Sequence, residues 1–424
     1  MTNKYSNSPV TDPQVAPDET TSSPATPLAQ PLPTGLSGKL VLFLAIAGGL
    51  SVANLYYCQP LLVAIGNEFK VSDGQAGIIS TLAQVGYGLG LLFIVPLGDA
   101  MERRNLIFRT LLAVSLALFG VAVAPNFIWL SIVITLVGIT TVVPQLIVPL
   151  AASMARPAER GRVIGNVMSG LLVGILLSRT VSGYINAWLG WRAVYFLALA
   201  LMLVLAFALR QVLPASPPKT NLRYGELLTS LVHLIKTEPV LRETAVLGGL
   251  AFGAMSSFWV TLTFLLSGAP FHYSSDIIGL FGLLGAAGAM MALFVGKLCD
   301  VINPRIITGV ALVLSLAGFI VAWVGGQFLP ALMAAIILLD LGTQAVQISN
   351  QNRIYSLKSE AGSRLNTVYM VSYFAGGSLG SFLGVAGWSW LGWDGVGIVG
   401  VGMVGLALLV YGLDLNRSMW RRRA

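Results

Sequence analysis

Charged residues are scarce in this chain: they make up 10% of its 424 residues, whereas hydrophobic residues make up 56%. An average soluble domain carries about 25% charged residues, so this composition excludes an ordinary soluble protein. Apolar stretches near 20 residues recur along the sequence, and each is long enough to cross a hydrocarbon core of about 30 Å as a helix. The composition therefore predicts an all-α integral membrane protein.

Histidine and cysteine are almost absent, with two of each. His233 and His272 lie far apart, which gives no metal-ligand cluster, and Cys58 and Cys299 leave no disulfide framework to propose. Neither a Gly-x-Gly-x-x-Gly nor a P-loop lysine pattern follows a predicted strand. We therefore predict no metal and no bound cofactor, and a membrane-embedded enzyme or sensor has no motif in its favour.

Acidic residues are outnumbered, since 17 Asp and Glu stand against 25 Lys and Arg. The net charge of +8 could suggest a nucleic-acid partner, but the placement of the basic residues argues against one. Of the 25 Lys and Arg, only Lys70 and Arg192 fall in loops on one side of the membrane, and Arg179 falls inside a span. The other 22 basic residues lie on the opposite side. This is the positive-inside pattern, so we predict cytoplasmic termini, contact with the lipid bilayer and no nucleic acid.

The apolar stretches predict twelve spans, an even number that fits two termini on the same side. We place them at 39–62, 75–97, 106–124, 127–152, 163–185, 193–211, 243–267, 276–296, 306–325, 330–352, 365–387 and 395–413. Residues 1–36, rich in Pro, Ser and Thr, are predicted to be a disordered cytoplasmic tail. Residues 416–424 form a basic cytoplasmic tail.

The sequence repeats itself at a shift of 202 residues. Trp188-Leu189-Gly190-Trp191 returns as Trp390-Leu391-Gly392-Trp393, Arg162 returns as Arg364, and Gly77 returns as Gly279. We therefore predict two pseudo-symmetric six-helix bundles, at 37–211 and 243–415. The cytoplasmic linker between them, 212–242, carries leucines on one face of a helix expected to lie on the membrane surface. Repeats of this size are typical of secondary transporters with a substrate site near mid-membrane.

The loop Pro96-Leu97-Gly98-Asp99 followed by Arg103-Arg104 has a second copy at Gly296 to Asp300 followed by Arg305. Both resemble the signature loop of the major facilitator superfamily, and the resemblance implies twelve helices and alternating access. The stretches ANLYYCQPLL, LLDLGTQAVQISNQ and RLNTVYMVSYFAGGSLGS are similar to a bacterial branch near the acriflavine-sensitivity and drug:proton antiporter families. That resemblance implies a bacterial inner membrane location and proton-coupled export.

The chain departs from that branch at several positions. Val95 stands where the first loop copy expects glycine, and Ile134 stands near the place where many drug antiporters carry an arginine. The fifth span reads GILLSRTVSG instead of a Gly-Pro-x-x-Gly-Gly element, and the first span has no acidic residue.

Only two ionisable groups are predicted to lie deep in the membrane, and Asp340 is one of them. Asp340 shares one helical face with three glutamines, spaced i, i+4, i+7 and i+11: Gln344, Gln347 and Gln351. This polar stripe predicts a helix that lines an aqueous cavity, although hydrogen bonding to neighbouring helices is the alternative. Because low dielectric favours a protonated carboxyl group, Asp340 is the candidate proton carrier. A permanently ionised partner of Arg179 is the alternative.

Arg179, the second deep charge, lies 17 residues after Arg162, about 25 Å along the fifth helix. Arginine keeps its charge and offers a planar fork of donors. It is therefore predicted either to lock the outer gate or to hold an anionic substrate. Other substrate contacts are predicted among polar and aromatic residues of four spans: Asn54, Tyr56, Tyr57, Gln59, Gln145, Trp259 and Tyr369. The tyrosines could instead belong to the membrane interface.

Conformational gating is predicted at the signature loops, where ion pairs between the halves would form only when the cytoplasmic side is shut. The residues assigned to this role are Asp99, Arg103, Arg104, Asp300, Arg305 and Arg364. Small residues recur every fourth position in the second, fifth, eighth and eleventh spans, for example at Gly86 and Gly90. Such spacing predicts helices that approach closely and slide along the seam between the halves.

Two transport hypotheses remain open from the sequence. The first is proton-coupled export of a small organic compound, and the second is proton-coupled uptake of an organic anion held by Arg179. Both expect a monomer whose partners are a small-molecule substrate and protons.

Overall fold

The computed structural model describes residues 36–156, 159–215, 224–357 and 362–423, and within these ranges every regular element is helical. The first half contains α1 (Gly38–Ala53), η1 (Gln59–Leu61), α2 (Leu62–Phe69), α3 (Asp73–Phe93), α4 (Leu97–Ala100), α5 (Arg103–Ala122), α6 (Phe127–Thr140), α7 (Val143–Met154), α8 (Arg160–Leu189) and α9 (Trp191–Val212). The second half contains α11 (Pro239–Ser267), α12 (Ser275–Val301), α13 (Pro304–Gly325), α14 (Leu329–Tyr355), α15 (Gly362–Leu391) and α16 (Trp393–Arg423). Between them lies α10 (Tyr224–Thr237).

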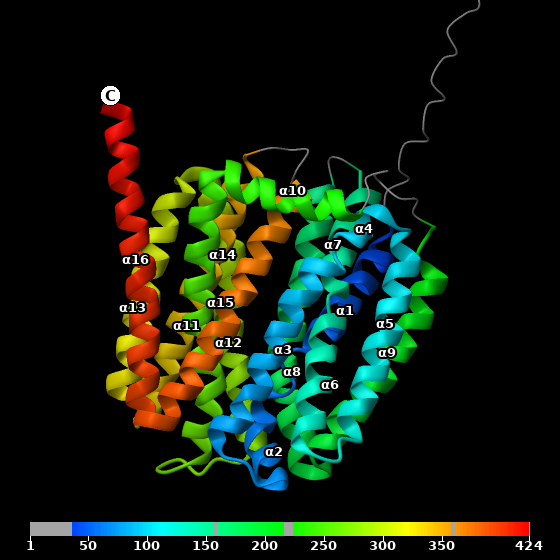
Figure 1. Cartoon of the computed structure of the whole chain (residues 1–424), viewed down its shortest axis with the longest axis vertical. Helices are drawn as coiled ribbons and strands as arrows, with labels where there is room; N and C mark the ends of the chain where they lie inside the picture. Colours follow the sequence, from blue (N-terminus) through cyan, green and yellow to red (C-terminus); the bar gives the residue numbers. More distant parts are fainter. Residues whose placement is uncertain (1–35, 157–158, 216–223, 358–361, 424) are drawn as a thin grey trace, which may run out of the picture.

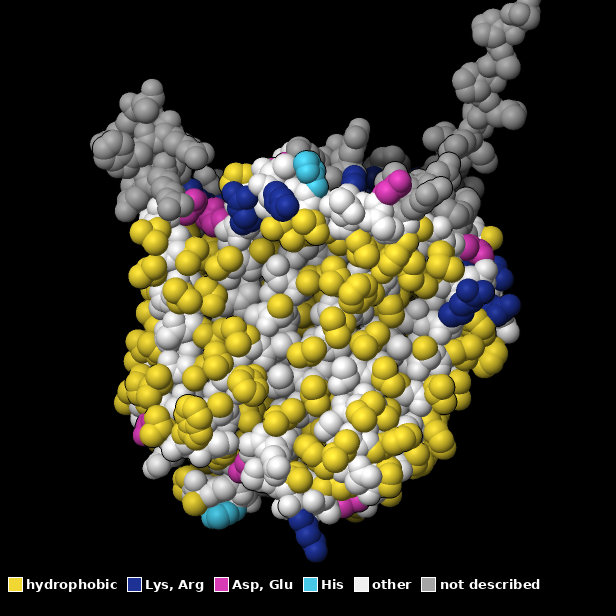
Figure 2. Space-filling view, in the orientation of Figure 1, with side chains coloured by type: hydrophobic (Ala, Val, Ile, Leu, Met, Phe, Trp, Pro, Cys, Tyr) yellow, Lys and Arg dark blue, Asp and Glu magenta, His cyan; other side chains and the backbone are white. Residues whose placement is uncertain are grey.

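The predicted fold class is confirmed. Ten helical segments of the described chain are long and apolar enough to cross a membrane, and the shorter apolar segments Gly38–Ala53 and Ser275–Gly285 belong to the first and eighth spans. Hydrophobic side chains cover the middle of the molecule, while charged side chains gather toward its two ends (Figure 2). The protein is therefore a multi-pass membrane protein with twelve membrane spans.

The first span is broken, which the sequence interpretation as one helix over 39–62 missed. The α1 helix ends at Ala53, a series of turns follows, and the chain resumes as η1 and α2 up to Phe69. Pro60 lies at the start of η1, where its missing N–H costs least, because a proline farther inside the helix would clash with the preceding turn. The fourth span breaks similarly between α6 and α7, just before Pro144.

The repeat is visible in how the helices end. Gly190 and Gly392, which the shift of 202 relates, both have positive φ angles, +80° and +60°, and both connect two membrane helices. Glycine adopts this backbone region without the steric penalty of a Cβ atom. The glycine of each Trp-Leu-Gly-Trp motif is therefore explained by a turn conformation shared by the two halves.

The small-residue pairs were expected along the seam between the halves, and most of that prediction is wrong. A Cβ at Gly90 would meet the α6 backbone, one at Gly174 would meet Gly49 of α1, and one at Gly376 would meet Gly249 of α11. These close approaches lie within one half. Gly282, where a Cβ would come within 2.9 Å of the Arg179 Cβ, does belong to the seam. Most of these glycine pairs therefore pack helices of one bundle together, whereas Gly183 and Gly279 approach each other across the seam.

The two ends of the molecule carry different elements (Figure 1). We call the end that carries α10, the start of α1 and the end of α16 the basic end, and the end that carries α2 the opposite end. The α10 helix lies across the basic end and buries Leu227, Leu231 and Leu234.

Candidate transport site

Five buried side chains from both halves form one group, which we call the central cluster: Tyr56, Gln59, Arg179, Trp259 and Asp340. The Arg179 Nε donates a 2.7 Å hydrogen bond to the Gln59 side-chain oxygen. Its guanidinium carbon lies 3.9 Å from the centroid of the Trp259 ring and 5.2 Å from that of Tyr56. The break after α1 brings Tyr56 and Gln59 to this position.

Trp259 links the two charged groups. Its indole Nε1 donates a 3.2 Å hydrogen bond to Asp340 Oδ1, while its ring face stacks on the Arg179 guanidinium. Desolvated stacking of this kind contributes about 2 kcal/mol. Each charge therefore has a partner in the membrane interior, as the cost of burying an isolated charge requires.

Asp340 lies at the boundary of the two halves. It is 4% exposed, and a Cβ added at Gly285 of α12 would meet its second carboxylate oxygen. Leu176 of α8 lies 3.1 Å from the same Cβ position. Thus α8 of the first half and α11, α12 and α14 of the second all meet at Asp340, and the carboxyl group does not face lipid.

The three glutamines of the predicted stripe have a different environment from Asp340, since they are half-buried. Gln347 accepts a 3.4 Å hydrogen bond from the Tyr373 hydroxyl, and Gln351 donates to Asn366 at 3.4 Å. Both partners lie on α15. These bonds are packing contacts within the second half, and the role of Gln344, Gln347 and Gln351 in a cavity stays a prediction.

Four aromatic rings form a layer next to the central cluster, with one ring from the first half. Tyr87 of α3 lies 4.4 Å from the Phe374 ring of α15, and Phe252 of α11 stacks on Tyr373 at 4.0 Å. The predicted contact Gln145 donates to the Tyr87 hydroxyl at 3.4 Å. Tyr369 is fully buried one helical turn from Tyr373. The sequence interpretation missed Phe252 and Phe374, because nothing marks them among 18 phenylalanines.

The remaining two predicted contacts make none of the contacts described for the central cluster. Asn54 is 2% exposed, and neither polar atom of its side chain has a hydrogen-bond partner in the described chain. Tyr57 lines a groove on the flank of the first half instead of the central cluster.

The opposite end is closed by hydrogen bonds between the halves. Thr180 donates to the Gly279 carbonyl at 2.9 Å, and Thr81 donates to Ser381 at 3.0 Å. Thr263 donates to the Gln59 carbonyl at 3.0 Å, just beside the central cluster. The void left there has a volume of about 10 Å³, the space of about one water molecule.

The basic end is open along the same helices. A Cβ added at Gly165 of α8 or at Gly296 of α12 would meet nothing within 4 Å, whereas Gly183 and Gly279 at the opposite end contact the backbone of the other half. Every hydrogen bond between α1–α9 and α11–α16 that the described chain makes lies on the opposite-end side of the aromatic layer. The halves are therefore apart at the basic end.

Between side chains that the structure describes, the predicted gating residues form no ion pair that joins the two halves. Arg103 pairs with Asp99 at 2.7 Å, and Arg104 donates to the Leu213 carbonyl at 3.3 Å. Arg305 pairs with Asp414 at 2.6 Å. None of these contacts joins the two halves, as expected when the basic end is open.

The partners predicted for Asp300 and Arg364 are not among these contacts. The Asp300 side chain lies outside the described residues, and Arg364 is half-buried at the start of α15. The pairs between the halves belong to the other conformation and remain a prediction. The sequence interpretation also missed Glu243, which is 8% exposed and pairs with Arg353 at 2.6 Å across 110 residues.

Two six-helix bundles that touch at one end, separate at the other and enclose buried charges at their boundary define a secondary transporter. Comparison with known families agrees: the model of the Major Facilitator Superfamily matches residues 44–363. The chain belongs to this family.

Relatives and solved structures support the same assignment. The uncharacterized transporter YgaY of Escherichia coli O157:H7 is 42% identical over 83% of this chain and 90% of its own length. The probable transporter SCO4007 of Streptomyces coelicolor is 33% identical over 88% of this chain and 90% of its own length. A bacterial homolog of the human lysosomal transporter Spinster, solved inward-facing and unoccupied, has a TM-score of 0.72 at 17% identity, covering 88% of this chain and 96% of its own. At that identity the likeness concerns the fold alone.

Proposed function

We propose that this transporter exports small organic compounds in exchange for protons by alternating access, with Asp340 as the proton carrier. The observation that carries the proposal is the position of Asp340 at the boundary of the halves, hydrogen-bonded to Trp259, which also stacks on Arg179. A change in the charge of Asp340 therefore acts directly on the residues that close the opposite end. Protons from a transmembrane gradient supply the energy, and no cofactor is required.

The orientation we propose places the basic end, with both termini, in the cytoplasm of a bacterium and the opposite end outside its inner membrane. The asymmetry of the basic residues supports it. The structure then corresponds to the state that is open to the cytoplasm. The assignment to the branch near the drug:proton antiporters rests on the three sequence stretches that resemble it.

In the proposed cycle, ionised Asp340 accepts the Trp259 hydrogen bond in the state seen here, and the substrate binds from the basic end. The aromatic layer offers it apolar faces, and the unpartnered amide of Asn54 offers a donor and an acceptor. After the halves rock, Asp340 takes up a proton from the outside, and the loss of its charge promotes substrate release. Return of the halves carries the proton inward.

The test is proton-coupled transport by Asp340→Asn in proteoliposomes that contain a pH-sensitive dye. Substrates come from a compound screen of a deletion strain. Asparagine keeps the acceptor for Trp259 but cannot carry a proton, so we expect substrate-induced proton flux to disappear while membrane insertion persists. Asp394→Asn is the matched control, because Asp394 also accepts a tryptophan N–H, that of Trp323, but at an exposed position. Wild-type proton flux in Asp340→Asn would reject the assignment.

The direction of transport needs a separate measurement in whole cells. An uncoupler should raise the accumulation of a labelled substrate if the protein exports it. A fall in accumulation would instead support uptake, and Arg179 would then be examined as the anion-binding group.

A further inference from the structure

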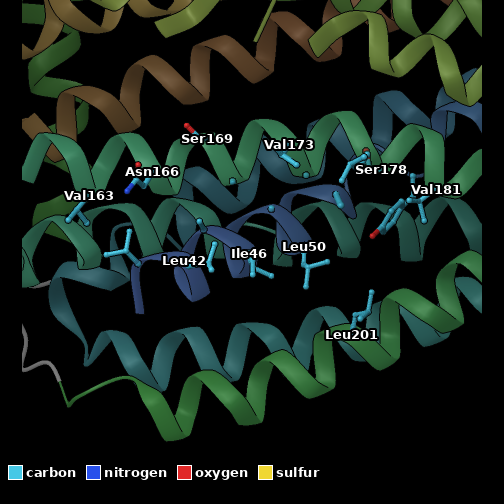
Figure 3. A pocket seen from close by; sticks show the side chains of 18 of the residues that line it. Leu42, Ile46, Leu50, Val163, Asn166, Ser169, Val173, Ser178, Val181 and Leu201 are labelled. Atoms are coloured by element: carbon cyan, nitrogen blue, oxygen red, sulfur yellow. The ribbon is translucent and has the colours of Figure 1, made fainter. Parts of the chain in front are cut away.

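A groove runs along the lipid-facing flank of the first half, between α1, α8 and α9, with a volume of about 760 Å³ (Figure 3). On α8 its lining reaches from Glu159 and Arg162 at the basic end to Ile185, about 35 Å along the helix axis. Exposed apolar side chains form much of the lining, including Ile46 and Val173. We propose that this groove binds one anionic phospholipid from the leaflet at the basic end.

The groove is polar at the basic end and apolar farther along, as a phospholipid is polar at its headgroup and apolar along its acyl chains. Arg162, Asn166 and Ser169 lie on one stripe of α8 at i, i+4 and i+7, and all three line the groove. They span about 10 Å from the basic end inward, comparable to the interfacial region of about 5 to 7 Å on each side of a bilayer. Arg162 can hold the phosphate, and the amide and hydroxyl suit the glycerol esters.

Farther along the stripe the lining becomes apolar. Val173, Leu177 and Val181 continue it on the same side of α8, and Leu201 faces them from α9. The hydroxyl of Ser178, which also lines the groove, already donates to the Ile175 carbonyl at 2.6 Å. An acyl chain therefore fits this part, whereas a second polar group would lose its hydration without a partner.

The shape and the charge of the groove favour a lipid over a protein segment. The groove is long and narrow, because a volume of about 760 Å³ is spread over about 35 Å, and this shape suits an extended acyl chain. The charge at the mouth of the groove is net positive, because two basic residues, Arg160 and Arg162, stand beside one acidic residue, Glu159. Basic pockets between membrane helices select anionic headgroups.

The groove lies entirely within one bundle. Its floor is the contact of α1 with α8, where a Cβ at Gly49 would come within 3.4 Å of Gly174. Rocking of the two halves therefore leaves the groove intact, and the proposal does not depend on proton coupling or on the direction of transport.

The test is native mass spectrometry of the delipidated full-length protein with phosphatidylglycerol and phosphatidylcholine of identical acyl chains. We expect the wild type to retain phosphatidylglycerol at least 10-fold better. Arg162→Gln should bring retention of phosphatidylglycerol down to that of phosphatidylcholine, whereas Arg162→Lys keeps a preference. Val173→Trp, which fills the groove, should lower the retention of both lipids.

Two control variants separate the groove from the general surface. Arg210→Gln removes a basic-end charge outside the groove, and Leu116→Trp enlarges a lipid-exposed side chain of α5 that is 73% exposed. Both should bind lipid as the wild type does, and all variants must elute as folded protein. Equal retention of the two lipids by the wild type would overturn the proposal. So would an unchanged preference in Arg162→Gln, or losses in the controls equal to those in Val173→Trp.

Discussion

Adding one methyl group to the seam should shift the equilibrium between the two conformations. A Cβ at Gly279 would lie 2.6 Å from the Arg179 carbonyl oxygen and 3.2 Å from the Thr180 Cα. Neither atom can move without shifting the α8 backbone, so Gly279→Ala should destabilise the closed opposite end by about 1 to 3 kcal/mol, the usual cost of overpacking. That free energy corresponds to a population shift of about 5- to 150-fold.

The same substitution at the other end of α12 should act in the reverse direction. Gly296 has nothing within 4 Å of its Cβ position because the basic end is open. If α8 and α12 approach there when that end closes, Gly296→Ala obstructs closure and favours the present state. Gly402→Ala on α16 is the neutral control, since its Cβ would also meet nothing and it lies away from the seam.

Electron paramagnetic resonance distances can follow both ends in a background without native cysteines. Spin labels at Lys70 and Trp390 report on the opposite end, and labels at Met101 and Leu298 report on the basic end. For Gly279→Ala we expect the first distance to lengthen and the second to shorten. If Gly279→Ala and Gly402→Ala gave identical distributions, the close-packed gate described here would be incorrect.

Three further predictions, the last with a comparison variant, concern single contacts. Trp259→Phe keeps a ring for stacking but removes the hydrogen bond to Asp340, worth about 1.5 to 3 kcal/mol for a charged acceptor, so coupled transport in proteoliposomes should fall about 10-fold or more. Gly285→Ala places a methyl group against the Asp340 carboxylate and should abolish proton flux in the same assay. Glu243→Gln breaks a buried ion pair and should lower the free energy of unfolding by about 3 to 5 kcal/mol, seen as a lower thermal midpoint in detergent. Asp414→Asn breaks an ion pair in which the Asp414 side chain is 40% exposed, so it should lower the free energy of unfolding by about 1 kcal/mol or less.

The sequence was sufficient to predict the spans and the two halves because both depend on local information. A stretch of about 20 apolar residues must be a helix in lipid, where every backbone polar group needs an internal partner. The Trp-Leu-Gly-Trp motifs fixed the repeat, and the positive φ angles of Gly190 and Gly392 give the physical reason for the glycine they share. The break after Ala53 was missed, since Pro60 can also occupy the first turn of a helix.

The contacts that make the site were beyond sequence reasoning because they join residues far apart in the chain. Trp259 and Asp340 are 81 residues apart, and Arg179 and Gln59 are 120 apart. The presence of two deep charges predicted that each needs a partner, but not that an indole ring lies between them. Paired glycines were similarly ambiguous, since the same spacing serves rigid packing inside a bundle and motion between bundles.

The placement of Trp259 between Arg179 and Asp340 suits a carboxyl group that must lose and regain its charge. In a direct buried ion pair, removal of one charge strands the other and costs about 3 to 5 kcal/mol. Here Arg179 keeps its stacking on Trp259 and its hydrogen bond to Gln59 whether or not Asp340 is ionised. Loss of the Asp340 charge therefore does not leave the arginine unpartnered, so the opposite end can close with Asp340 either ionised or protonated, as the proposed cycle requires.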